Sequence, residues 1–250
     1  MADTQTWFHW SGGKDSAYAL WRLMQQQEVH GLVTSFSGAH KRVSMHGVPE
    51  RLVDAQALAL GLPLHKFYLP EGCSMDDYDA IIAREMAALK TQGASHCAFG
   101  DIFLEDLKKY REKQIQAAGL ECQFPIWQEA DTTTLAERII DAGIEASVVC
   151  INSKKVPAEL IGQRYDRDFL AALPANVDPC GENGEFHSFV THAPNFSAPI
   201  PITLGEVMAT SYQPADQEEA DDKARCGAKA SWDTEFLFQS LNLAGRSGFL

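Results

Sequence analysis

The chain has 250 residues, of which 45% are hydrophobic and 22% are charged, and its formal net charge at pH 7 is −13. This length suits one sizeable α/β domain with a small appendage, or two modest domains. The negative charge argues against a sequence-independent nucleic-acid binder, which needs clustered lysine and arginine. The sequence opens on no signal-like segment, and no apolar run reaches about 18 residues. We therefore expect a cytoplasmic protein with no membrane partner.

The six cysteines are widely scattered and form no C-x-x-C pair. Neither a zinc ribbon nor a thioredoxin-type redox site is therefore indicated. We expect reduced, structural cysteines.

The most informative stretch runs from Trp7 to Ser16, with the sequence WFHWSGGKDS. It predicts a short apolar strand, a glycine turn and a helix over 15–26. The adjacent Gly12 and Gly13 let a ligand approach the backbone closely, and the start of the helix offers free N–H groups to a polyphosphate. Lys14 adds a positive charge, and the remaining candidate ligand-binding groups are the hydroxyls of Ser11 and Ser16.

Other readings of this stretch are a Gly-Gly hairpin or an ordinary helix cap made by Ser11. The spacing does not fit a Walker A loop. An apolar strand before the turn and an amphipathic helix after it favour a nucleotide-binding loop.

Strand-like and helix-like segments then alternate along the chain. We expect strands at 29–36, 64–69, 96–99, 121–127 and 146–151, and helices at 49–60, 75–92, 103–118 and 132–142. This alternation predicts an α/β fold, a Rossmann-like, mostly parallel sheet with helices on both faces. Thr34, Gly100 and Asp101 fall at the carboxyl ends of predicted strands, where such sheets bind ligands. The polar segment 37–48, which contains His46, is expected to be an active-site loop.

Three parts are expected along the chain. Residues 1–151 would form the nucleotide-binding domain. Residues 152–205 would form a smaller C-terminal α+β portion, with a helix near 157–173. Residues 206–250 read as an acidic tail, poorly ordered over 214–230, whose aromatic residues at 232 and 236–238 could dock on the domain.

A second polar cluster lies within 180–189, where the sequence is CGENGEFHSF. Glu182, Asn183, Glu185 and His187 could gather around a substrate or a magnesium ion. If this segment is extended, Glu185 and His187 point to the same side. The alternative is a hairpin turn with solvated acids.

Four segments together resemble the diphthine–ammonia ligase family: the glycine loop, VSMHGV at 43–48, FGDIFLED at 99–106 and GENGEFH at 181–187. The resemblance spans residues 6 to 201 and is nearest to the bacterial branch. These are PP-loop proteins with a HUP-type, adenine-nucleotide α-hydrolase-like core. The closing GENGEFH signature is more specific to the family than the glycine loop.

The resemblance implies an ATP-dependent amide ligase. A carboxylate would attack the α-phosphate to give an acyl-adenylate and pyrophosphate, and ammonia would then release AMP. Eukaryotic and archaeal members use diphthine, a modified histidine of elongation factor 2, which bacteria lack. The acceptor is therefore an unassigned carboxylate, on a small molecule or a protein side chain. With no ammonia-generating domain in the chain, free ammonium or another amine would be the nucleophile, and a homodimer is compatible with the sequence.

Roles follow for the candidate residues. Asp15 would help to hold Mg²⁺, and a base would deprotonate ammonium, with Glu185 or His187 as first candidates and His46 as a second. The expected catalytic residues are Lys14, Asp15, Glu185 and His187. The expected ATP-binding residues are Ser11, Gly12, Gly13, Lys14, Asp15, Ser16, Thr34, His46, Gly100 and Asp101. The expected acceptor-binding residues are Glu105, Glu182, Asn183 and Glu185.

Two other functions compete with the ligase. A HUP-fold sensor would bind ATP without ligating anything. A PP-loop enzyme acting on tRNA would call for a cysteine pair and a basic surface, and this acidic chain without C-x-x-C disfavours it.

Overall fold

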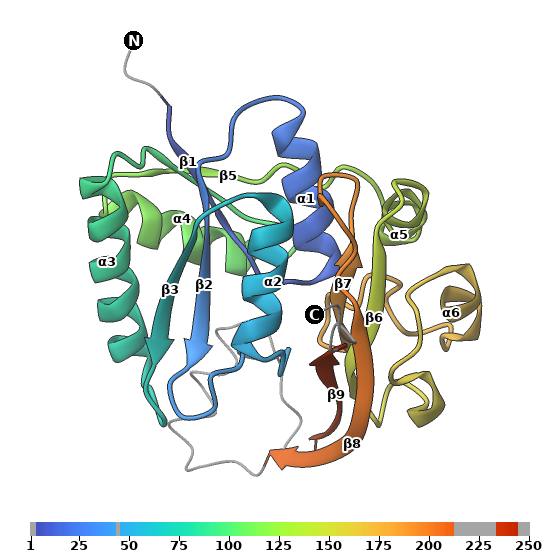
Figure 1. Cartoon of the computed structure of the whole chain (residues 1–250). Helices are drawn as coiled ribbons and strands as arrows, with labels where there is room; N and C mark the ends of the chain where they lie inside the picture. Colours follow the sequence, from blue (N-terminus) through green and yellow to red (C-terminus); the bar gives the residue numbers. More distant parts are fainter. Residues whose placement is uncertain (1–3, 44–45, 213–233, 245–250) are drawn as a thin grey trace, which may run out of the picture.

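The computed structural model describes residues 4–43, 46–212 and 234–244 (Figure 1). A parallel sheet and an antiparallel sheet lie side by side, with helices around them. No helix within these ranges is both long and apolar enough to cross a membrane.

The first sheet has five parallel strands in the order β3-β2-β1-β4-β5. The strands are β1 (Thr6–His9), β2 (Gly31–Ser37), β3 (Leu64–Leu69), β4 (His96–Ala98) and β5 (Glu121–Gln123). The helices that alternate with them are α1 (Lys14–Met24), α2 (Glu50–Leu60), α3 (Met75–Thr91) and α4 (Glu105–Ala117). The predicted α/β fold with a mostly parallel sheet is confirmed.

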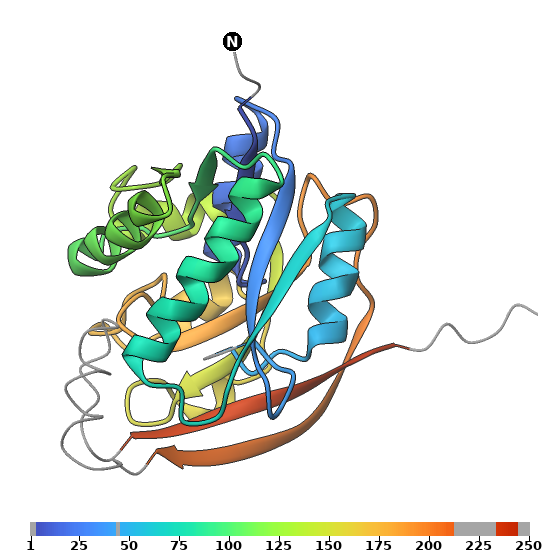
Figure 2. The same ribbon diagram turned by 90° about the vertical axis from the view of Figure 1, so that its left-hand side faces the viewer.

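Helices cover both faces of this sheet because successive strand residues face opposite sides. Phe8 of β1 packs with α1 and α2 in one cluster. Trp7, its neighbour, packs with α3 and α4 in another. Figure 2 shows α3 and α2 on opposite sides of β2 and β3.

The second sheet has four antiparallel strands in the order β7-β6-β9-β8. Its strands are β6 (Glu145–Asn152), β7 (Phe186–His192), β8 (Ile202–Tyr212) and β9 (Thr234–Leu243). The helix α5 (Thr132–Asp141) precedes it. Its N-cap is Asp131, whose side chain accepts a hydrogen bond from Thr134 N.

Placing 146–151 in the parallel sheet was wrong, because this segment is the centre of β6. Val148 and Val149 are both buried, so β6 has the continuous apolar pattern that is usual for parallel strands. The parallel sheet therefore ends with β5 and the antiparallel sheet begins with β6, so the change from one sheet to the other comes before β6 rather than after residue 151. Residues 206–212 and 234–243, assigned to the acidic tail, belong to β8 and β9. The predicted disordered stretch 214–230 and Trp232 lie outside the described residues.

The single helix expected over 157–173 is also wrong. The structure has a 3-10 turn at Ala158–Leu160 and a short helix, α6 (Arg167–Ala172), capped by the side chain of Asp166. Between them Gly162 takes a φ of +76°, which favours glycine. The chain then runs along β6, where Val148 N donates to Gln163 O at 2.8 Å.

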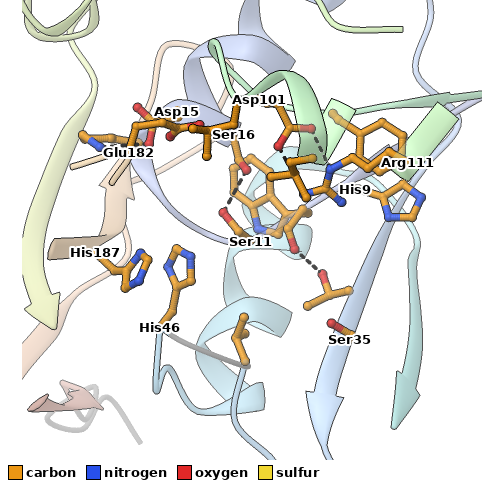
Figure 3. Close-up of a pocket in the computed structure, with 18 of the residues that line it drawn as sticks. His9, Ser11, Asp15, Ser16, Ser35, His46, Asp101, Arg111, Glu182 and His187 are labelled. Carbon is orange, nitrogen blue, oxygen red and sulfur yellow. Dashed lines mark hydrogen bonds and ion pairs between the residues drawn. The ribbon is translucent and has the colours of Figure 1, made fainter. Parts of the chain in front are cut away.

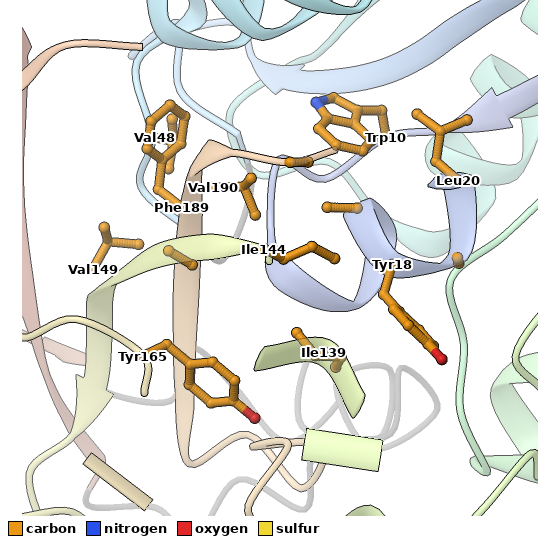
Figure 4. Packing of buried hydrophobic residues seen from close by; sticks show 14 of the residues in the cluster. Trp10, Tyr18, Leu20, Val48, Ile139, Ile144, Val149, Tyr165, Phe189 and Val190 are labelled. Carbon is orange, nitrogen blue, oxygen red and sulfur yellow. The ribbon is translucent and has the colours of Figure 1, made fainter. Parts of the chain in front are cut away.

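The two sheets share one hydrophobic core (Figure 4). Trp10, Tyr18 and Leu20 come from the β1–α1 unit, and Val149 and Phe189 come from the second sheet. Since the largest cluster of buried side chains lies between the sheets, we expect them to unfold together.

Leu241 and Leu243 on β9 test whether the last strand is integral to the fold. Leu241 is 2% exposed and belongs to the core, whereas Leu243 is 39% exposed. We expect Leu241→Ala to lower the free energy of unfolding by about 2–4 kcal/mol through transfer and cavity costs. Leu243→Ala should cost less than about 1 kcal/mol. Urea unfolding of both variants checks this, and equal small losses would show that β9 is a dispensable appendage.

Candidate functional site

The glycine loop between β1 and α1 is fixed by contacts from both sheets. Gly12 has a φ of +81°, and a Cβ there would lie 2.7 Å from Gln56 Oε1. Its carbonyl accepts hydrogen bonds from Val190 N at 2.9 Å and from Gln56 Nε2 at 3.0 Å. Glycine is therefore required here for both conformation and space.

The first turn of α1 is held by hydroxyl groups. Lys14 N donates to Ser188 Oγ at 3.2 Å, and the Oγ atoms of Ser11 and Ser16 lie 2.8 Å apart. Behind Ser16, a Cβ on Gly100 would be 2.9 Å from Ser16 Cα. The segment just after β4 therefore packs directly against the start of the helix.

A cavity of about 340 Å³ opens beside this loop, between the carboxyl ends of the parallel strands and the second sheet (Figure 3). Its lining includes the charged residues Lys14, Asp15, Asp101 and Glu182. It also includes apolar residues from β2, β3, α3 and α4 and from the segments just after β4 and just before α4: Val33, Phe67, Ile82, Phe99, Leu104 and Leu107. Small-molecule sites commonly combine a few polar groups with an apolar wall.

The ammonium group of Lys14 is buried by the C-terminal part of the chain. Nζ donates to Asp15 Oδ2 at 2.8 Å and to the carbonyl of Cys180. It also lies 5.2 Å from the ring centre of Tyr165 and 5.1 Å from that of Phe186. Burial alone would lower the pKa of Lys14, but Asp15 and Cys180 outweigh it and the pKa is raised. The side chain is therefore charged at neutral pH.

Acidic groups gather next to this lysine. Burial, together with Asp15 and Asp101, raises the pKa of Glu182 to about 8. The pKa of Asp15 is also raised by burial, and its Oδ1 is buried without a hydrogen-bond partner among the described residues. Asp101 is paired with Arg111, whose Nε lies 2.7 Å from Oδ2. Within the described ranges, no three His, Cys, Asp or Glu side chains are arranged to hold a metal by themselves.

Two histidines, His46 and His187, lie side by side in the lining of the cavity (Figure 3). The ring centres of His46 and His187 are 4.5 Å apart, at an interplanar angle of 31°. Burial lowers the pKa of His46 to about 4, and burial with the nearby His46 and Lys14 holds the pKa of His187 well below its usual value. Both rings are therefore neutral at pH 7.

Sequence reasoning missed several residues of the site. His9 stacks on Phe99, with ring centres 4.2 Å apart, and the Arg111 guanidinium lies 4.6 Å from the same ring. Burial, with Arg111, lowers the pKa of His9 to about 3. Ser188 directly follows the signature at 181–187 and was within reach of sequence reasoning. Arg111 and Gln56 lie within helices and gave no comparable signal.

Most predicted site residues converge on the cavity. Its lining contains Ser11, Lys14, Asp15, Ser16, Thr34, His46, Gly100, Asp101, Glu182 and His187. Gly12 and Gly13 do not line the cavity and serve the loop behind it. The Thr34 hydroxyl is already used, since it donates to Trp10 O at 2.7 Å.

Besides Gly12 and Gly13, three more predicted residues lie outside the cavity lining. Glu105, in the first turn of α4, and Asn183 are exposed. Glu185 is buried, with Oε1 3.8 Å from Lys155 Nζ. Glu185 and His187 were expected to share one side only if the segment from 185 is extended, and this condition is not met because β7 begins at Phe186, after a turn.

Comparisons with known proteins bear on the family of the chain. The family model described as the diphthamide synthase N-terminal domain matches residues 4–122, and that of the C-terminal domain matches 131–213. No curated protein sequence matches the chain. A solved structure titled as a predicted subunit of tRNA methyltransferase from Methanocaldococcus jannaschii is 14% identical, with a TM-score of 0.37 over 76% of this chain and 97% of the other.

The two family models match adjoining parts of the chain in the order expected of one enzyme. They confirm the family resemblance given by the glycine loop and the GENGEFH signature. The glycine loop is the nucleotide-binding element of PP-loop enzymes, which use ATP. With most of its length matched by these two models, the chain belongs to the diphthamide synthase family.

Proposed function

We propose that the protein is an AMP-forming ligase that activates a carboxylate with ATP and transfers it to ammonia. The observation that carries this proposal is the convergence of two family segments on one cavity. The glycine loop supplies Lys14 and Asp15, and the GENGEFH signature supplies Glu182 and His187. The cavity, at about 340 Å³, lies within the range of about 300–1,000 Å³ usual for small-molecule sites.

The mixed polar and apolar lining of this cavity suits ATP. The triphosphate would lie over the loop from Ser11 to Ser16, at the start of α1. Lys14 has three ammonium hydrogens, of which Asp15 and the Cys180 carbonyl take two, leaving one for a phosphate oxygen. The adenine would lie against the apolar residues Val33 and Phe99 of the lining.

A magnesium ion would be held jointly by the protein and the phosphates. Mg²⁺ commonly takes one or two carboxylates together with substrate phosphates and water. The unpartnered Oδ1 of Asp15 is a suitable oxygen for this arrangement. When bound, the ion would supply charge neutralisation for the leaving pyrophosphate.

The chemistry would proceed in two displacements. The carboxylate oxygen of the acceptor bonds to the α-phosphorus, and the bond from that phosphorus to the bridging oxygen breaks and releases pyrophosphate. The nitrogen of ammonia then bonds to the acyl carbon and releases one proton to water, and the carbon–oxygen bond to AMP breaks, so that a neutral amide and AMP form. The protein contributes mainly by positioning these groups and stabilising charge. The acceptor is a carboxylate on a small molecule or a protein side chain, and ammonium is the amine source.

Glu182 is the residue that we propose as proton acceptor for ammonium. Its pKa of about 8 is near the working pH, which suits a general base. Glu185, a candidate from the sequence, lies outside the cavity lining. His46 and His187 are neutral but weakly basic, so they are better suited to accept hydrogen bonds.

The first test is pyrophosphate release from Mg-ATP and ammonium, with and without pooled carboxylate metabolites. We expect metabolite-stimulated release that falls by about 100-fold or more in Lys14→Ala, because a charge beside the reacting phosphates is lost. Lys90→Ala is the matched control. Lys90 also donates from Nζ to a backbone carbonyl, that of Ala118, but it does not line the cavity. ATP binding without release under any of these conditions would contradict the small-molecule ligase and favour the nucleotide sensor.

A second test uses the raised pKa of Glu182. The pKa of Glu182 is about 8 in the folded protein and near 4.5 in the unfolded chain. The contribution of this carboxyl to the free energy of unfolding is therefore fully present below pH 4.5. This stabilisation is lost as pH rises toward 8. Relative to Glu182→Gln, the wild type should therefore lose stability between pH 5 and pH 8.5 in urea unfolding.

Glu105→Gln, at an exposed position outside the cavity lining, is the control and should show no such divergence. Glu182→Gln should also reduce AMP formation by about 100-fold or more if Glu182 is the base. Parallel stability curves for wild type and Glu182→Gln would show that the carboxyl has an ordinary pKa.

A further inference from the structure

The loop that carries His46 packs against the last strand of the chain. Gly47, the next residue, has a φ of +66°, and a Cβ there would lie 2.8 Å from Phe238 Cδ1 and 3.2 Å from Cε1. The three atoms nearest to that position all belong to the Phe238 ring. The ring therefore lies directly against the main chain beside His46.

On its other side, His46 reaches into the cavity. Its Cε1 is 3.1 Å from the position of a Cβ on Gly13, and its ring faces His187 (Figure 3). The Nδ1 atom is buried and has no hydrogen-bond partner among the described residues. The ring also has a hydrogen bond with the backbone of Ser188, so its orientation depends on where the backbone of the loop places it against β7.

Hydrogen bonds within the loop give it a compact shape. Gly47 N donates to Val43 O at 3.0 Å, Val43 N donates to Val48 O at 2.9 Å, and Arg42 Nη1 donates to Gly47 O at 2.6 Å. These bonds close the loop on itself. The contact with Phe238 joins the loop to the second sheet.

Phe238 is well suited to act as a support. In β9 it is paired with Cys150 of β6 and with Met208 of β8, so its backbone has a strand on each side. Residues 234–243 lie outside both family-model matches, of which the second ends at residue 213. The support therefore comes from a part of the chain that the family models do not describe.

We propose that Phe238 is a positioning residue that holds His46 in the cavity through the backbone of Gly47. The packing role stands on the contacts alone. Its effect on ligation rests on the proposed function, because a group at a reacting centre must be held to within a fraction of an ångström.

The experiment compares Phe238→Ala, Phe238→Leu and the matched control Phe236→Ala in the full chain without ATP. Phe236 is on the same strand, and its ring centre is 6.4 Å from that of Phe238. Carbon–proton NMR of the histidine rings reports on His46, assigned by its loss in His46→Gln. The His9 ring, stacked on Phe99, serves as an internal reference.

In Phe238→Ala we expect the His46 resonances to shift and broaden, while those of His9 stay in place. The titration midpoint of His46 should rise from about 4 toward its ordinary 6.5, because the ring becomes more hydrated and lies farther from Lys14. Phe238→Leu should restore part of the wild-type signal. Unchanged His46 resonances in a folded Phe238→Ala variant, or an equal change in Phe236→Ala, would overturn the proposal.

Gly47→Ala approaches the same contact from the loop. Its methyl group would meet the Phe238 ring, so the His46 resonances should change in this variant too. Combining it with Phe238→Ala should give a smaller total change than the sum of the two, since one steric conflict is removed. Strictly additive effects would overturn the proposal. These spectra need no turnover, so failure of the ligase assay would leave this test intact.

Discussion

One backbone carbonyl, that of Gly12, joins the glycine loop to the second sheet. It accepts hydrogen bonds from Val190 N of β7 and from the Gln56 side chain of α2. Gln56 also accepts from Trp10 Nε1 at 2.9 Å and donates to Val190 O at 2.8 Å. Because every polar group of the Gln56 amide is paired in a buried setting, this network specifies one geometry for the loop. Losing a partner would leave buried groups unpaired, at a cost of about 1–3 kcal/mol each.

The same junction explains how a lysine can remain charged in the interior. Lys14 extends from α1, but the Cys180 carbonyl and the rings of Tyr165 and Phe186 that surround its ammonium all come from the C-terminal part. An isolated buried ammonium would be very costly, and these partners with Asp15 offset that cost. Neither sheet alone could provide this environment, so the two segments matched by family models form one site.

Local sequence signals located the parallel sheet and the glycine loop, because strand period, glycine turn and helix start all agreed there. The placement of β6 failed because an apolar run such as Val148–Val149 does not distinguish a buried antiparallel strand from a parallel one. β9 was missed because its pairing with β6 spans more than 80 residues, which no local pattern encodes. Within the signature, the choice between Glu182 and Glu185 depended on where the turn ends and β7 begins.

The charges around the cavity determine when the Glu182 carboxyl would gain and lose a proton. In the ligand-free protein its pKa is raised by burial and by Asp15 and Asp101. A bound triphosphate would raise it further, because like charges disfavour the carboxylate. Magnesium at Asp15 and an ammonium ion would lower it, by favouring the charged form. Between these opposing effects the pKa of the carboxyl would stay near neutral. In the proposed reaction, Glu182 would then take up a proton from the bound amine and return it to solvent after the product leaves.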